Sequence, residues 1–241
     1  MNHKNLIGIL FVLVLYSSEI YSQDSLKASN KNTKRKFWIG VNFSPDLCYR
    51  NLIVLGDTSN SRESYRKYET YKFNFSAGVN LLYYLKDNIN IESGLQYSNK
   101  GYRSISNYTY THDSGKYEII DSWYYVDIPL KVNICFGKKK LKYTLGAGIV
   151  GNILLAGGTR YTFLPDRGSK VSSYYNNWGS LSESNASFTA NAGLVWQFKA
   201  NQQIKFEPTF RYAMFDPSKS RVFKEYLWTL GLNIGYYFKC R

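Results

Sequence analysis

Few residues in this chain of 241 could carry acid–base or nucleophilic chemistry. It contains two histidines and three cysteines, too few for a histidine–cysteine metal cluster or a disulfide framework. His112, with Ser106, Asp113 and Ser114 close in sequence, provides the residue types of a hydrolase in which histidine activates a serine. The same residue types are ordinary in turns. We adopt the turn interpretation and assign no catalytic, cofactor-binding or metal-binding residue.

The three cysteines, Cys48, Cys135 and Cys240, are too far apart in sequence to form a metal motif with two cysteines in close succession. A disulfide between Cys135 and Cys240 and three free thiols are both compatible with the sequence.

A second group of chemically capable residues contains three acids and two bases: Glu92, Asp127, Lys131, Glu207 and Arg211. Each occupies a polar position in a segment where polar and apolar residues alternate. If these positions face the lumen of a narrow barrel, the charges must pair, because an isolated buried charge costs several kcal/mol. The sequence therefore predicts a network of salt bridges that plugs the lumen. A gated path for ions or protons is the alternative.

The segments that must position these charges alternate with a period of two, over about 12 residues or more, which is typical of long β-strands with one apolar face. Eight such segments are expected: 37–51, 71–85, 89–100, 124–136, 141–156, 186–198, 204–215 and 225–238. The connections alternate between long and short, as in outer-membrane barrels with long external loops and short periplasmic turns. We predict an all-β fold: an eight-stranded antiparallel up-and-down transmembrane β-barrel, with both termini periplasmic.

The apolar faces of these segments carry many large side chains and have aromatic residues near their ends. A soluble barrel would direct these side chains inward, where they would overfill the lumen. Facing lipid, they form the aromatic girdles expected at the two membrane surfaces. Pro129 and Pro208 cannot donate a ladder hydrogen bond, so we expect a bulge or a local water at each.

The N-terminus predicts the compartment. Lys4 precedes an apolar run, Leu6–Tyr16, and a small residue, Ser22, stands at the expected cleavage point. This order is typical of a secretory signal peptide, and the run is too short to span a bilayer. We predict a cleaved signal peptide over 1–22, a basic periplasmic tail over 23–36, and the outer-membrane barrel over 37–238.

Several motifs resemble the PorT-like outer-membrane β-barrel family of Gram-negative bacteria. They are the opening Ile39-Gly40-Val41-Asn42, the stretch Tyr125-Val126-Asp127-Ile128-Pro129-Leu130, the glycine-rich Leu145-Gly146-Ala147-Gly148, and an aromatic last strand. The resemblance covers about 37–238, and its motifs are structural. It implies an eight-stranded barrel whose family members mostly lack a defined biochemical role, although the founding member belongs to a protein secretion system. Lys239-Cys240-Arg241 follow the final aromatic Phe238, whereas the strand signal read by the barrel-assembly machinery commonly ends on that aromatic.

The formal net charge is +14, and many basic residues lie in the tail and in the predicted external loops. Secretion removes nucleic acid as a partner. The phosphates of lipopolysaccharide around the outer rim are the natural counter-charge, and solvated loop charges without a specific ligand are the alternative. Other expected partners are outer-membrane lipids, the barrel-assembly machinery during insertion, and a protein at the external loops. No cofactor is expected.

Together these features predict a non-enzymatic integral outer-membrane protein with a structural, adhesive or assembly role. Two alternatives are an accessory component of a protein secretion system and an outer-membrane enzyme that acts on lipid A or on extracellular protein. The scarcity of histidine disfavours the enzyme.

Overall fold

The computed structural model describes residues 37–54, 68–109, 114–137, 140–219 and 223–240. The signal peptide and basic tail expected over 1–36 lie outside these residues, as do His112 and Asp113. Within the described ranges, no helix is long and apolar enough to cross a membrane.

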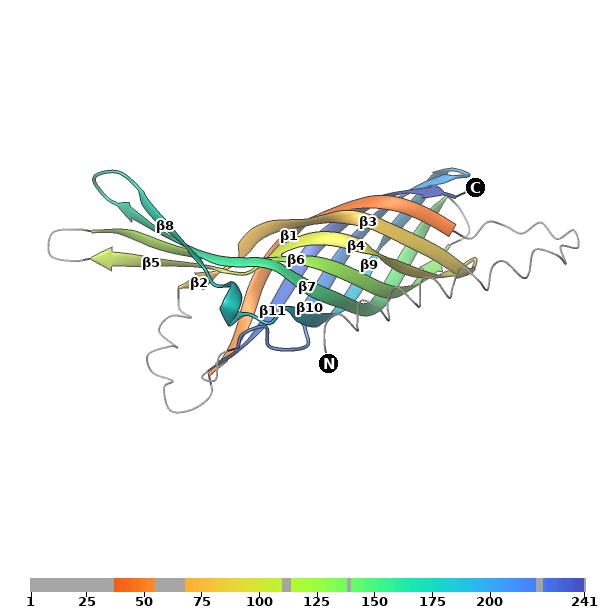
Figure 1. Cartoon of the computed structure of the whole chain (residues 1–241). Helices are drawn as coiled ribbons and strands as arrows, with labels where there is room; N and C mark the ends of the chain where they lie inside the picture. Colours follow the sequence, from red (N-terminus) through yellow and green to blue (C-terminus); the bar gives the residue numbers. More distant parts are fainter. Residues whose placement is uncertain (1–36, 55–67, 110–113, 138–139, 220–222, 241) are drawn as a thin grey trace, which may run out of the picture. The chain divides into compact units, whose positions relative to one another are not determined.

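Eight antiparallel strands close into a barrel (Figure 1). They are β1 (Phe37–Val54), β3 (Lys72–Lys86), β4 (Ile89–Lys100), β6 (Ser114–Phe136), β7 (Leu141–Pro165), β9 (Ser184–Lys199), β10 (Gln202–Ala213) and β11 (Phe223–Lys239). Each pairs with the next in this order, and β11 pairs with β1 to complete the ring. The predicted eight-stranded antiparallel barrel is confirmed.

The alternation along each strand separates two surfaces. In β1, Ile39, Val41 and Phe43 point outward and are exposed, whereas Asn42 and Ser44 point inward and are buried. Packing apolar side chains outward leaves the interior to polar residues, the reverse of a soluble barrel. The buried positions of the barrel are accordingly rich in Asn, Thr, Ser and charged residues.

Aromatic side chains form contacting groups near both ends of the apolar surface. At the end where β1 begins and β11 finishes, here called the terminal end, ring contacts join Phe37 to Tyr83 and Phe198 to Tyr236. The opposite end is called the extended end. Its girdle comprises Tyr49, Tyr71, Tyr97, Tyr124, Phe210, Tyr212, Tyr226 and Trp228, connected by ring contacts. Two such girdles are the expected mark of two membrane interfaces.

Register shifts occur at three places: between Tyr84 and Lys86, between Gln202 and Ile204, and between Tyr124 and Tyr125. The first two adjoin the tight turns at the terminal end. A bulge or a local water was expected at Pro129 and Pro208; no bulge occurs at either, and the water stays a prediction. Pairing is interrupted beside each proline, on the β4 side of Pro129 and the β9 side of Pro208, and resumes in the same register. A strand residue donates to one neighbour only, so a proline removes one bond without requiring an extra residue.

Two of the long connections predicted as loops, 101–123 and 157–185, are largely structured, so that prediction is wrong for them. Strands β6 and β7 continue past the barrel and pair along their length. They are flanked by β5 (Arg103–Thr109) and β8 (Val171–Asn176), and a short β2 (Glu69–Thr70) pairs with β5. A single turn of 3-10 helix, η2 (Trp178–Ser180), follows β8. The resulting sheet projects beyond the barrel (Figure 1).

Candidate functional site

Four charged side chains meet in the middle of the lumen: Glu92 from β4, Lys131 from β6, and Lys205 and Glu207 from β10. Lys205 Nζ lies 2.7 Å from Glu92 and 2.9 Å from Glu207, and Lys131 Nζ lies 3.0 Å from Glu92 and 3.9 Å from Glu207. All four side chains are at most 5% exposed. Each cation therefore contacts both carboxylates, and the group, called here the central quartet, is electrically balanced.

Uncharged donors complete the coordination of the two carboxylates. Glu92 accepts hydrogen bonds from Asn80 Nδ2 (2.8 Å), Asn133 Nδ2 (3.1 Å) and the Tyr237 hydroxyl (3.2 Å). Glu207 accepts hydrogen bonds from Asn191 Nδ2 of β9 (3.0 Å) and, at the longer distance of 3.4 Å, from Asn233 Nδ2 of β11. A buried ion pair is stabilising only when its remaining lone pairs are also satisfied, and this polar shell meets that requirement.

Asp127 and Arg211 belong to a separate layer nearer the extended end. Asp127 pairs with Lys100 Nζ at 3.0 Å and accepts a hydrogen bond from Asn152 at 2.6 Å. Arg211 lies 3.5 Å from Asp46, which also accepts from Ser44 and Ser76. The five predicted charges thus occupy two layers of the lumen. Asp127 and Lys131 are four residues apart on one strand, so their spacing along the barrel axis keeps them from pairing.

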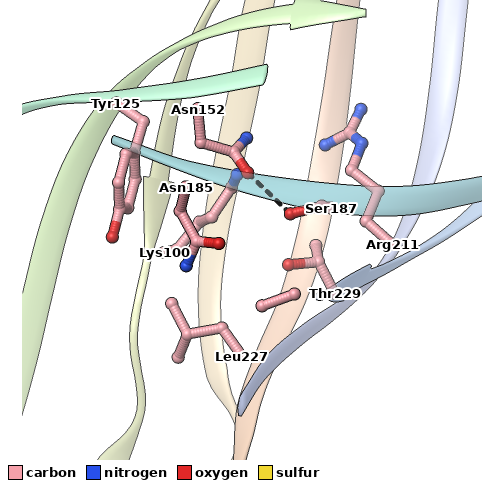
Figure 2. A pocket seen from close by; sticks show the side chains of 9 residues that line it. Lys100, Tyr125, Asn152, Asn185, Ser187, Arg211, Leu227 and Thr229 are labelled. Atoms are coloured by element: carbon pink, nitrogen blue, oxygen red, sulfur yellow. Dashed lines mark hydrogen bonds between the residues drawn. The ribbon is translucent and has the colours of Figure 1, made fainter. Parts of the chain in front are cut away.

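A cavity about the size of one water molecule lies in this second layer. Figure 2 shows the side chains of Lys100 and Arg211 on opposite sides of it, with Thr229 between. Asn152 and Ser187 form its wall and are joined by a hydrogen bond of 2.6 Å. Leu227 and Ala213 close the side nearer the extended end. The space is too small for a metabolite.

Apolar clusters lie above and below the charged layers. At the terminal end, Trp38, Leu82 and Tyr237 pack together, with Tyr84 against them. Toward the extended end the cluster comprises Trp123, Tyr125, Leu154, Leu181, Ala213 and Leu227, with Tyr102 packed against it. The lumen therefore has a polar, charge-paired interior between two apolar layers.

Arg50 occupies the mouth of the barrel at the extended end. Its guanidinium forms ion pairs with Glu69 of β2 and, at 2.7 Å, with Glu225 of β11, and it stacks 3.6 Å above the ring of Tyr102. Glu225 lies just beyond the girdle residue Tyr226 and therefore outside the membrane-spanning part of the strand. Burial raises the pKa of Glu225 to about 7, although Arg50 opposes that shift.

Three partners of the predicted charges were missed from the sequence: Asp46, Lys100 and Lys205. Lys205 was identifiable, because it shares a polar face with Glu207 two residues away. Lys100 is the last residue of its predicted strand, where inward orientation was harder to infer. Asp46 shares the polar face of Asn42 and Ser44, so its inward orientation was also identifiable. Of the hydrolase-like set, Ser106 lies in β5 and Ser114 begins β6, where its hydroxyl donates to Asp166. His112 and Asp113 lie outside the described residues.

The cysteines are free thiols. Cys48 and Cys135 are buried, and Cys240 is partly exposed. Cys135 faces inward at the terminal end, as its position in the alternation predicts. Among the described residues, no group of three or more His, Cys, Asp and Glu side chains is arranged to hold a metal ion.

A family model described as "Outer membrane protein beta-barrel domain" matches residues 20–241. Among solved structures, Neisserial surface protein A has 14% identity and a TM-score of 0.41, covering 85% of this chain and 97% of that one. Outer membrane protein OprG of Pseudomonas aeruginosa has 11% identity and a TM-score of 0.39, covering 85% and 96%. The outer membrane protease OmpT of Escherichia coli has 6% identity and a TM-score of 0.38, covering 88% and 99%.

These structural similarities are too distant to support an argument about activity, and no curated protein matches the chain. Family membership follows from the family model, which spans nearly the whole sequence, and it agrees with the outward apolar surface, the two aromatic girdles and the polar lumen. The chain belongs to the outer membrane protein beta-barrel domain family and is an integral protein of the Gram-negative outer membrane.

Proposed function

We propose that the protein is a closed, non-enzymatic barrel that anchors an extracellular sheet in the outer membrane, in a structural, adhesive or assembly role. The observation that carries this proposal is the filled lumen. The central quartet, its amide shell and the two apolar clusters occupy the interior from one girdle to the other. An eight-stranded barrel has room for side chains but not for a solute path.

The same packing supports a non-enzymatic role. A general acid or base must reach the proton that it transfers. Glu92 and Glu207 are each held by two lysines and are fully buried, and Asp127 is held by Lys100. None of these carboxylates is exposed to a space that could hold a substrate.

In this proposal the terminal end faces the periplasm and the extended end faces outside, so that the sheet of β5, β6, β7 and β8 is presented to the surroundings. Lys219 and Lys224 are exposed near the rim of the barrel and would lie close to the outer leaflet, where lipopolysaccharide phosphates supply counter-charge. Lys116, Arg160, Arg167 and Lys170 are exposed on the projecting sheet and its β7–β8 turn, farther from the membrane. The barrel-assembly machinery would act during insertion, and a protein partner would bind at the projecting sheet.

Planar-bilayer recording of the purified protein tests the closed lumen. We expect no stable conductance steps. The matched comparison is the double variant Glu92→Ala with Glu207→Ala, which removes both carboxylates of the quartet but leaves the outer surface unchanged. Large, stable steps from the unmodified protein would contradict the proposal.

Labelling of a cysteine introduced at Lys170 in intact cells tests the orientation: a membrane-impermeant reagent should reach it.

A further inference from the structure

The projecting sheet has four strands, in the order β5, β6, β7, β8, and therefore two edges. The β5 edge is partly covered. Glu69 of β2 pairs with Ser104 and Thr70 with Arg103, and the amide of Ile105 donates to the carbonyl of Tyr68. No described strand pairs with the outer side of β8. The two edges of one sheet therefore differ in access.

Strand β8 lacks the features that normally block an open edge. Natural edge strands are protected by lysine, proline, bulges or coverage by another element. Residues 171–176 read Val-Ser-Ser-Tyr-Tyr-Asn and contain neither a charge nor a proline. All six are exposed, and their pairing with β7 runs from Val171 to Asn176 without a register shift. The outer N–H and C=O groups of β8 are a straight template for another strand.

The side chains around this edge indicate the chemistry of such a strand. On one face, Tyr117, Tyr161 and Tyr175 form a row across β6, β7 and β8, with ring centroids 6.2 Å and 5.4 Å apart. On the other face, Arg160 stands opposite Tyr174 in the β7–β8 register. One face would accept apolar or aromatic side chains, and the other presents a cation.

The charge around the edge is positive. Lys116, Arg160, Arg167 and Lys170 are exposed around β7 and β8. The three described acidic residues of the same region already have partners within the chain: Glu118 forms an ion pair with Arg103, Asp121 accepts from the hydroxyl of Thr159, and Asp166 accepts from the hydroxyl of Ser114. Complementary charge selects partners and accelerates their encounter. The surroundings of β8 therefore favour an acidic segment.

We propose that the open edge of β8 binds an extended, acidic segment of a partner protein, which adds to the sheet as a fifth strand. Main-chain hydrogen bonds to β8 provide the affinity, and alternating acidic and apolar side chains provide the specificity. The inference rests on the proposed function, because the edge is available to a foreign protein only if the extended end faces outside. Binding to purified protein tests the edge alone, whereas conductance and surface labelling test the proposed function.

The probe is a fluorescent eight-residue peptide in which glutamate alternates with valine and tyrosine. Its binding to the full-length protein in nanodiscs is followed by anisotropy, and amide hydrogen exchange is measured in parallel. We expect saturable binding and at least tenfold slower exchange at alternate amides of residues 171–176, with β5 amides unchanged. A matched peptide with lysine in place of glutamate, and a peptide N-methylated at every residue, should each bind at least tenfold more weakly.

Two variants separate the edge from the charge. Ser173→Pro disturbs the template and should reduce binding at least tenfold, while heat-dependent migration in gels reports that the barrel is folded. The double variant Arg160→Glu with Lys170→Glu should also weaken binding of the acidic peptide at least tenfold. The control variant Lys199→Glu, at the terminal end, should leave this binding unchanged. Should Ser173→Pro interfere with folding, the methylated peptide provides the same test on the unmodified protein.

Three outcomes would overturn the inference. Equal binding of the glutamate and lysine peptides would remove the charge argument, and binding without slower exchange in β8 would indicate attachment to the basic rim instead. Dimers detected by sedimentation, with protection of β8 in the absence of peptide, would show that a second copy of this chain covers the edge.

Discussion

Lys205 and Glu92 join strands on directly opposite walls of the barrel. Lys205 Nζ lies 2.7 Å from Glu92 Oε2, and in the ring of eight strands four steps separate β10 from β4 in either direction. Most strand contacts in a barrel are between neighbours, so a cross-lumen ion pair connects parts of the wall that share no ladder. The central quartet therefore holds the barrel closed across its diameter.

Removing one charge of this pair should be costly. Glu92→Gln leaves Lys131 and Lys205 with one carboxylate between them, and we expect the free energy of unfolding to fall by about 3–5 kcal/mol. Lys205→Met should have a comparable effect, because it leaves two buried carboxylates with one lysine. The double variant should cost clearly less than the sum of the two. Urea unfolding in detergent micelles measures all three.

The pair Arg103–Glu118 is the control for this cycle. It has similar chemistry but lies in the projecting sheet, with the arginine side chain 42% exposed. Removing either partner there should cost about 0.2–1 kcal/mol. A loss for Glu92→Gln no larger than that of Glu118→Gln would contradict a structural role for the quartet.

Two adjacent leucines of β3 test the division between lumen and lipid. Leu82 is fully buried against Trp38 and Tyr237, whereas Leu81 faces outward and is exposed. Leu82→Ala should lower the free energy of unfolding by about 2–5 kcal/mol, because it empties part of a packed cluster. Leu81→Ala leaves no enclosed cavity and should cost much less. Equal losses would argue against an inward apolar layer.

The glycines of β7 provide a test of close packing. A Cβ at Gly148 would lie 2.1 Å from the carbonyl oxygen of Leu130 and 2.7 Å from the Cα of Lys131, so the backbone of β6 must shift. A Cβ at Gly151 meets only the oxygen of Ile128, at 3.9 Å. Gly148→Ala should destabilise the barrel by about 1–3 kcal/mol, and Gly151→Ala should be nearly neutral. The measurement is again urea unfolding, and a neutral Gly148→Ala would contradict the predicted shift.

The barrel itself was predictable because a period of two is preserved along every strand, and because membrane burial places the larger side chains on one parity. Strand number and the inward orientation of Glu92, Asp127, Lys131, Glu207 and Arg211 followed from that parity. Parity did not show which of these charges contact one another. Contacts across the lumen depend on the stagger of the strands, and a sequence reveals parity but not axial height.

The sheet that continues beyond the girdle could not be predicted from the sequence either. Past Trp123 and Gly157, β6 and β7 no longer separate lipid from lumen, so apolar and polar residues lose their strict alternation. Their continuation as a sheet depends on pairing with each other and with β5 and β8. Long-range pairing of this kind leaves little trace in local composition, and turn-forming residues there suggested loops.

The mouth of the barrel should respond to pH through Glu225. Burial raises its pKa to about 7 in the folded protein, above the ordinary value near 4.3. The folded state therefore holds this proton more tightly than the unfolded state, and the contribution of Glu225 to stability falls as pH rises from about 4.5 through 7. Glu225→Gln cannot ionise and removes this dependence. Relative to the variant, the unmodified protein should lose on the order of 1–3 kcal/mol between pH 4.5 and 8.

Unfolding of both proteins across this pH range measures the difference directly, and a carbon NMR titration of labelled glutamate reports the pKa itself. Glu69→Gln is the control: it also removes a carboxylate that contacts Arg50, but Glu225 remains to titrate. The fall in stability with pH should therefore persist in Glu69→Gln and disappear in Glu225→Gln. A parallel pH dependence in the unmodified protein and Glu225→Gln would show that the pKa of the carboxylate is not raised, and that Arg50 fully offsets the effect of burial.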